Sequence, residues 1–200
     1  FSGTPVNANV GAITVKVTAT DAAGVAISDT FTITITNTND APTLANAITD
    51  QSVDEDSALS FAVPSNTFDD VDADDSLTYA ATLGDGSALP SWLSFNTSTR
   101  AFSGTPVNAN VGAITVKVTA TDGSSATVSD TFTITVANTN DAPSEIGLSA
   151  TVIDENDSGA VVGTLSTTDI DASDTFIYAL TGGDDKDSFE VVNGQLKLKD

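Results

Sequence analysis

Hydrophobic and polar residues alternate along two stretches of the chain, residues 112–121 and 131–136. In the first, the hydrophobic positions are Ile114, Val116, Val118 and Ala120, and those between them are Thr115, Lys117, Thr119 and Thr121. In the second, Phe132, Ile134 and Val136 alternate with Thr131, Thr133 and Thr135. Since successive side chains of a strand point to opposite faces, both stretches are predicted to be antiparallel strands with one buried and one solvated face.

Shorter stretches of β-forming residues precede these two. We expect further strands near residues 44–53, 58–63, 76–82, 92–95 and 100–103, separated by turns rich in Gly, Pro, Asn and Asp. About seven short strands in a hundred residues are typical of a Greek-key β-sandwich. The predicted fold class is therefore all-β, with tandem Greek-key β-sandwich modules.

The chain repeats itself. Residues 1–21 recur without change at 102–122, and residues 28–42 recur with two substitutions at 129–143. A repeat of this kind predicts an array of similar modules. We place the boundaries after the two NTNDAP strings. Residues 1–42 are then the C-terminal part of one module, 43–143 a complete module, and 144–200 the N-terminal part of a third.

Charge narrows the range of functions. The chain has 6 basic and 28 acidic residues, a formal net charge of -22, and no Cys, His or Met. Phosphates would be repelled, so nucleic acid is not an expected partner. Disulfides, thiol nucleophiles, zinc sites and histidine bases are excluded. The acidic excess must be solvated or neutralised by cations, among which Ca²⁺ suits carboxylate oxygens. No apolar run in this segment is long enough for a membrane span.

Residues 89–122, followed by the string VSDTFTITVANTNDAP, resemble a dystroglycan-type cadherin-like domain, and residues 144–200 resemble a cadherin repeat. Such modules are found in large repetitive bacterial surface adhesins. The resemblance is carried by features that recur in one order along the chain. They are the NTNDAP linkers, the A-T-D aspartates Asp21 and Asp122, the acid pairs Asp70/Asp72 and Asp169/Asp171, and the strings around Glu55 and Glu155. It implies a cadherin- or immunoglobulin-like sandwich.

The resemblance also implies calcium sites between modules. The ligands that it implies for the first junction are Asn37, Asn39, Asp40, Asp70, Asp72 and Asp122. Those for the second are Glu55, Asn138, Asn140, Asp141, Asp169 and Asp171, with a last ligand beyond residue 200. The linker is one Asn shorter than in many cadherins, and the acids that support the outer ions have no counterpart in residues 98–105. We therefore expect fewer ions at each junction.

The acidic loop, the linker and Trp92 also allow other interpretations. An EF-hand loop starting at Asp70 would place Asp75 where that loop has Gly and Ala81 where it has Glu. The acidic loop and the linker could instead be a solvated loop and a plain turn. Trp92 could offer a platform for a sugar, but its position beside Leu93 and Phe95 favours core packing.

The function expected from these features is that of a structural extender in a secreted or surface-anchored bacterial adhesin, with Ca²⁺ stiffening the junctions. Its partners would be neighbouring modules of the same long chain. The alternative is a calcium-dependent carbohydrate-binding or homophilic cell-adhesion module, whose partner would be a cell-surface glycan or another adhesin. An enzyme is not expected, because the paired carboxylates recur with the linkers at module ends. The lack of Cys favours a bacterial exterior over an extracellular animal protein.

Overall fold

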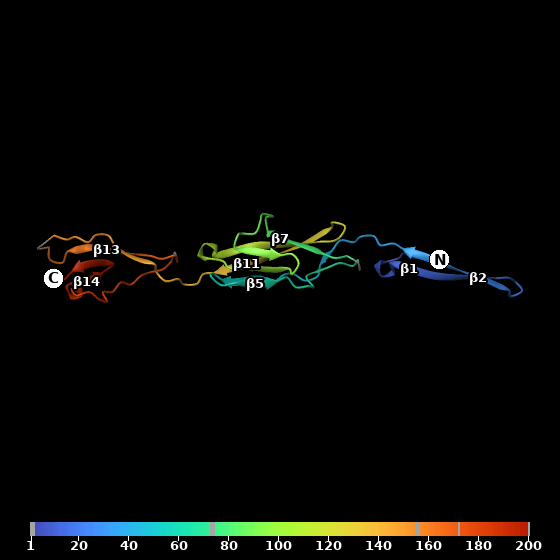
Figure 1. Ribbon diagram of the computed structural model, residues 1–200, viewed down its shortest axis with the longest axis horizontal. Coiled ribbons are helices and arrows are strands. Elements are labelled where there is room, and N and C mark those ends of the chain that lie inside the picture. Colours follow the sequence, from blue (N-terminus) through green and yellow to red (C-terminus); the bar gives the residue numbers. More distant parts are fainter. Residues whose placement is uncertain (1–2, 73–74, 155–156, 172, 200) are drawn as a thin grey trace. The chain divides into compact units, whose positions relative to one another are not determined.

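The computed structural model describes residues 3–72, 75–154, 157–171 and 173–199, and the chain forms two compact units, Phe1–Ala137 and Asn138–Asp200 (Figure 1). Strands are the main regular structure of both units, and the helical elements described are three short 3₁₀ turns. The predicted all-β fold is confirmed. The module boundaries after residues 42 and 143 stay predictions.

Most of the first unit is a β-sandwich. Its strands are β3 (Thr43–Leu44), β4 (Gln51–Asp54), β5 (Leu59–Ala62), β6 (Phe68–Asp69), β7 (Thr78–Leu83), β8 (Leu93–Asn96), β9 (Ala101–Gly104), β10 (Gly112–Thr121) and β11 (Thr127–Ala137). One sheet has the order β4-β11-β10-β7, another the order β5-β9-β8, and β3 pairs with β6. A 3₁₀ turn, η2 (Asn108–Asn110), joins β9 to β10. Strand β4 runs parallel to β11, and the other pairs are antiparallel.

The prediction of one continuous strand near residues 44–53 is wrong. The structure has β3 and β4 there, and they pair in different sheets. Between β3 and β4 the chain crosses from one sheet to the other. There its backbone N–H groups donate to a loop carbonyl and to a side chain instead of to a neighbouring strand. The N–H of Ala45 donates to the carbonyl of Thr67 (2.9 Å), and the N–H of Ile48 donates to Asp130 Oδ2 (2.7 Å). Strand β6, which the sequence pattern does not predict, is only two residues long.

The core lies between the two larger sheets. Val116, Val118 and Ala120 are buried, as are Phe132, Ile134 and Val136, so the predicted faces of β10 and β11 are confirmed. Opposite them lie Leu59, Leu93 and Phe102. The rings of Phe102 and Phe132 meet edge to face with 5.7 Å between centroids. Trp92 packs against this core, which agrees with the expectation of core packing over a sugar platform.

Residues before the sandwich form a two-stranded hairpin. Strands β1 (Gly11–Thr20) and β2 (Ala26–Ile35) follow the 3₁₀ turn η1 (Asn7–Asn9). Their register repeats that of β10 and β11, with Val15 opposite Phe31 where the sandwich has Val116 opposite Phe132. Among the described residues, β1 pairs with β2 alone, and the two strands form a separate sheet. The same sequence is therefore seen once with a covering sheet and once without one.

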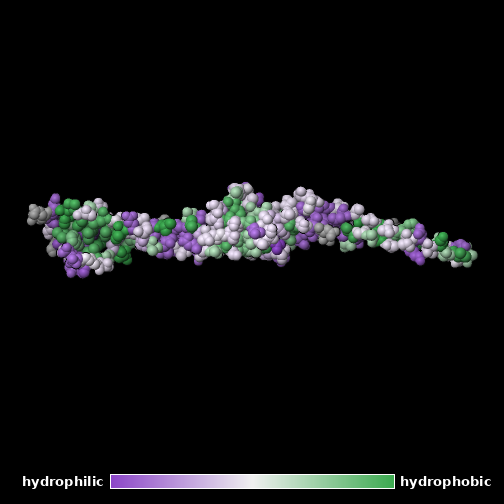
Figure 2. Space-filling view, viewed as in Figure 1, coloured by the Kyte–Doolittle hydropathy of each residue, from purple (hydrophilic) through white to green (hydrophobic). Residues whose placement is uncertain are grey.

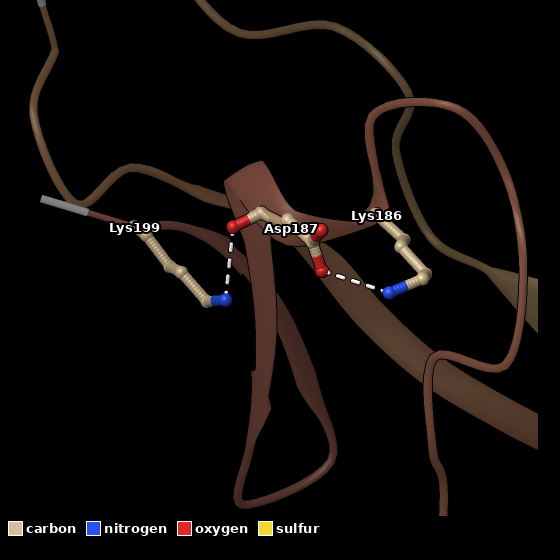
Figure 3. A network of polar contacts seen from close by, with 3 residues as sticks. All are labelled: Lys186, Asp187 and Lys199. Atoms are coloured by element: carbon tan, nitrogen blue, oxygen red, sulfur yellow. Dashed lines mark hydrogen bonds and ion pairs between the residues drawn. The ribbon is translucent and has the colours of Figure 1, made fainter.

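The second unit holds one four-stranded sheet of order β12-β13-β15-β14. The strands are β12 (Glu145–Leu148), β13 (Val161–Thr168), β14 (Phe189–Val192) and β15 (Gln195–Leu198), and a 3₁₀ turn, η3 (Lys186–Ser188), precedes β14. Figure 3 shows how this turn is held. Asp187 pairs with Lys186 (2.8 Å), and its carbonyl accepts a hydrogen bond from Lys199 Nζ (2.9 Å) beyond the end of β15. The turn is thus tied to the end of the sheet.

One prediction concerns the bend between β3 and β4. Asp130→Ala should lower the free energy of unfolding of the sandwich by about 1–2 kcal/mol, because the buried N–H of Ile48 loses its acceptor. A denaturant titration followed by tryptophan fluorescence measures this. The control is Asp29→Ala, at the matching place in the hairpin, where Asp29 caps the N–H of Thr30 as Asp130 caps that of Thr131. Equal losses for the two variants would contradict the prediction.

Candidate metal centre

Three aspartates gather in the loop between β6 and β7. Asp70 Oδ1 accepts a hydrogen bond from the backbone N–H of Asp72 (3.0 Å), and the carbonyl of Asp72 accepts one from the N–H of Asp75 (3.0 Å). These two turns fold the loop back, so that one carboxylate oxygen from each aspartate lies within 4.8 Å of the others. Strands flank the loop on both sides, so it is not an EF-hand.

Two oxygens of this cluster are buried without a donor. Among the described residues, Asp70 Oδ2 and Asp75 Oδ2 accept no hydrogen bond. Burial raises the pKa of Asp75, and the nearby carboxylates of Asp122, Asp70 and Asp72 raise it further. Buried carboxylate oxygens that face one another are costly unless a proton or a cation lies between them. The cluster therefore has the chemistry of a site for a hard cation.

The linker that follows β2 is bound to this cluster. The backbone N–H of Asp40 donates to Asp72 Oδ2 (2.8 Å). Asn39 Nδ2 donates to Asp122 Oδ2 (3.0 Å), and this hydrogen bond is the largest cause that lowers the pKa of Asp122. The other oxygen of Asp122 accepts the backbone N–H groups of the turn between β10 and β11, which fixes the carboxylate. Linker, acidic loop and hairpin turn thus meet at one place.

Five of the six residues implied for the first junction are brought together here: Asn39, Asp40, Asp70, Asp72 and Asp122. Asn37 is exposed just beyond the end of β2. Asp75 and Asn7 were missed. Asn7 Nδ2 lies 3.0 Å from Asp40 Oδ2 and 3.4 Å from Asp72 Oδ1, so an amide from the turn before β1 also contacts the acids.

The second unit repeats the arrangement. One oxygen each of Asp169, Asp171 and Asp174 lie within 4.8 Å of one another. Asp169 Oδ1 accepts the N–H of Asp171 (3.0 Å), and Asp171 Oδ2 accepts the N–H of Asp141 (2.7 Å). Asp169 Oδ2 is buried and, within the described ranges, accepts no hydrogen bond. Each of these contacts has its counterpart in the first cluster.

The remaining residues implied for the second junction divide between the units. Asn138 Nδ2 donates to Asp171 Oδ1 (2.8 Å), and Asn140 Nδ2 donates to the carbonyl of Asp141 (2.7 Å), both inside the second unit. Glu55 belongs to the first unit, where it is buried and its backbone N–H donates to the carbonyl of Ala137 (2.9 Å). Glu155, quoted for the resemblance, lies outside the described residues.

A prediction follows for Asp75. The pKa of Asp75 is raised in the folded state. Protonation of Asp75 therefore stabilises the cation-free fold, and this stabilisation is lost as the pH rises through the folded-state pKa. In chelator at pH 7, Asp75→Asn should therefore raise the melting temperature. In Ca²⁺ it should reduce the gain that the ion gives, because a ligand oxygen has lost its charge.

The control for this pair of measurements is Asp85→Asn. The pKa of Asp85 is lowered, chiefly by its hydrogen bonds from Ser87, so removal of its charge should not stabilise the protein. Melting curves with and without chelator give both shifts. A lower melting temperature for Asp75→Asn in chelator would show that its carboxylate is not under repulsion.

The fold and the repeated acidic clusters define a sandwich protein of the cadherin and immunoglobulin-like class. The chain matches the family described as "Putative Ig domain" (He_PIG) over residues 1–36 and 41–137, and it belongs to this family. No curated protein matches it. In the described part of the chain, no helix is long and apolar enough to cross a membrane.

Solved cadherin structures share the fold. Protocadherin PcdhgB3 EC1-4 is 16% identical to this chain, with a TM-score of 0.68. The alignment covers 98% of this chain and 50% of the protocadherin chain. Protocadherin gamma B7 extracellular cadherin domains 1-4 is 20% identical with a TM-score of 0.59 (96% and 49% covered). Mouse cadherin-23 EC22-24 is 20% identical with a TM-score of 0.62 (94% and 63%). The chain thus spans about half the length of the two protocadherin structures. The resemblance to cadherin-like repeats is confirmed.

Proposed function

We propose that this chain is an extender segment of a calcium-dependent bacterial surface or secreted adhesin, in which Ca²⁺ braces each linker against the module that follows it. One observation carries the proposal. The same set of contacts between a linker and an acidic loop occurs twice, around Asp72 and around Asp171. A solvated acidic loop would not need the same hydrogen bonds in two modules of different sequence.

The donor set supports Ca²⁺ in particular. Each cluster consists of carboxylates with asparagine side chains beside them, and the chain has no Cys or His. Ca²⁺ takes about 6 to 8 oxygen ligands in flexible geometry, whereas Mg²⁺ demands a tighter octahedron. We assign Asp70, Asp72 and Asp75 to the loop side of the first site. Asp40 and Asn39 of the linker, together with Asp122, would complete it.

The chain's own residues explain how an ion would stiffen the junction. Without an ion, the N–H of Asp40 and the amide of Asn39 already tie the linker to Asp72 and Asp122. A shared cation would attract both the carboxylate of Asp40 in the linker and the carboxylates of the following module, which otherwise repel one another. The segment would then act between neighbouring modules of one long chain, outside the cell or on its surface.

Isothermal calorimetry with Ca²⁺ on the whole chain tests the proposal. The wild type should show two classes of sites. Asp72→Ala should remove the class in the first unit and Asp171→Ala the class in the second, each with at least a tenfold loss of affinity. Asp85→Ala is the matched control, because Asp85 binds Ser87 in a separate turn. Titration curves that do not change in either cluster variant would refute the proposal.

A further inference from the structure

The turn η1, which precedes β1, is closed by one of its two asparagines. The backbone N–H of Val6 donates to Asn9 Oδ1 (3.0 Å), and the N–H of Asn9 donates to the carbonyl of Val6 (2.7 Å). The same pair of hydrogen bonds closes η2 at the matching place of the repeat. Asn7, the first asparagine of the string N-A-N, gives this turn only its backbone. Its side chain is therefore available for a contact outside the turn.

The side chain of Asn7 bridges two carboxylates from different parts of the fold. Its Nδ2 donates to Asp40 Oδ2 in the linker (3.0 Å) and to Asp72 Oδ1 in the loop between β6 and β7 (3.4 Å). An amide nitrogen carries two hydrogens, so one group serves both acceptors. Figure 2 shows hydrophilic residues at the surface where the linker meets the sandwich. The turn before β1 is thus bound to the linker and to the acidic loop together.

This bridge divides the acidic cluster into two parts. Asp72 is buried, and both of its oxygens accept a hydrogen bond, Oδ2 from the N–H of Asp40 and Oδ1 from Asn7. The neighbouring oxygens Asp70 Oδ2 and Asp75 Oδ2 are buried and, among the described residues, accept none. One part of the cluster is therefore satisfied by the chain itself, and the other part is left for a cation.

No basic side chain does this work. In the described part of the chain, neither Asp40 nor Asp72 forms an ion pair with a Lys or Arg. Two carboxylates held close together repel each other unless a positive charge or a hydrogen-bond donor lies between them. A hydrogen bond to an ionised acceptor is stronger than one between neutral groups. The amide of Asn7 supplies such donors without a cation.

We infer that Asn7 is a cation-independent tether, a positioning residue that holds the turn before β1 against the linker and the acidic loop when no Ca²⁺ is bound. The tether keeps Asp40 near Asp72, and ligands that are already in place bind at a lower entropic cost. The tether rests on the hydrogen bonds alone. Its effect on Ca²⁺ affinity rests in addition on the proposed function.

Limited proteolysis of the whole chain near Thr38, carried out in chelator, tests the tether. Asn7→Ala should be cleaved about fivefold faster than the wild type, because both donors are lost. Asn7→Asp has the same shape but no donor and a charge that Asp40 and Asp72 repel, so it should be cleaved faster still. The matched control is Asn108→Ala, at the same place of the repeat, which should leave cleavage near Thr38 unchanged.

A spectroscopic measurement separates the contact from a general loosening of the hairpin. In ¹H–¹⁵N spectra of the wild type in chelator, the side-chain amide signal of Asn7 is the one that Asn7→Ala removes. This signal should shift in Asp40→Ala and in Asp72→Ala, because each variant removes one acceptor. It should keep its position in Asp85→Ala, since Asp85 lies in a separate turn with Ser87.

Two results would overturn the inference. One is cleavage of Asn7→Ala at the wild-type rate in chelator. The other is an Asn7 amide signal that neither aspartate variant moves. Calorimetry with Ca²⁺ adds the second part, in which Asn7→Ala should bind about fivefold more weakly than the wild type because its ligands are no longer held in place. If the wild type binds no Ca²⁺ while both results in chelator hold, the proposed function fails and the tether stands.

Discussion

Val116→Asp is expected to unfold the sandwich of the first unit. Val116 is fully buried among Val118, Phe132 and the strands of the opposite sheet. An aspartate there has no cation or donor to compensate its charge, and the loss should exceed about 3–5 kcal/mol, a large part of the stability of a small domain. Circular dichroism should show the loss of sheet signal at 25 °C, together with the loss of a cooperative melting transition.

Two controls separate charge from position. Lys117→Asp changes the next residue of β10, on the partly exposed outer face, and should shift the melting temperature only slightly. Val15→Asp places the same charge at the same position of the repeat, but in the hairpin, where Val15 is less buried. At concentrations where the chain is monomeric, it should leave the sandwich intact. Equal damage from Val116→Asp and Lys117→Asp would mean that the assigned strand faces are wrong.

Removal of Ca²⁺ should free the linker while the sandwich stays folded. The core contacts do not involve the acidic loop, so module 43–143 should keep its sheet signal in chelator. Cleavage near Thr38 should become faster, because the linker is then held only by the hydrogen bonds of Asn39, Asp40 and Asn7. Ca²⁺ at a hundred times its dissociation constant should stabilise the folded state by about 2.7 kcal/mol through mass action.

Two variants test this, and each loses one carboxylate, either inside the acidic cluster or outside it. Asp72→Ala should abolish the protection of the linker and the rise in melting temperature, since Asp72 contacts both the loop and Asp40. Asp85→Ala should leave both responses intact. Cleavage rates that are the same with and without chelator would indicate that the acidic cluster is merely solvated.

The sequence predicts most where a local pattern decides the structure. Alternation along β10 and β11 gave the buried faces, because one register of a sheet buries every second residue. The bend between β3 and β4 escaped prediction, since it depends on Asp130, a residue 82 positions from the N–H that it accepts. Short pairs such as β3 with β6 are stabilised by neighbouring strands, and no periodicity marks them.

In the candidate site, too, the residues in local repeated strings could be predicted and those brought in from a distance could not. Asp70, Asp72 and Asp122 stand in recurring strings, and the spacing of Asp75 recurs at Asp174, so that ligand could have been found from the repeat. Asn7 could not. It lies 65 residues from Asp72 in an uncharged turn, and only the fold brings its amide to the cluster. The ligand positions themselves stay a prediction until an ion is measured.

The identity of residues 1–21 and 102–122 has a consequence for folding. Either hairpin presents the side chains that the core of the sandwich accepts, and near-identical neighbouring segments of this kind are prone to misassembly during folding. Hydrophobic matching cannot separate them, because β1 and β10 present the same side chains. Asn39 donates to Asp122, which lies in the turn of the second hairpin, so this contact distinguishes that hairpin from the first.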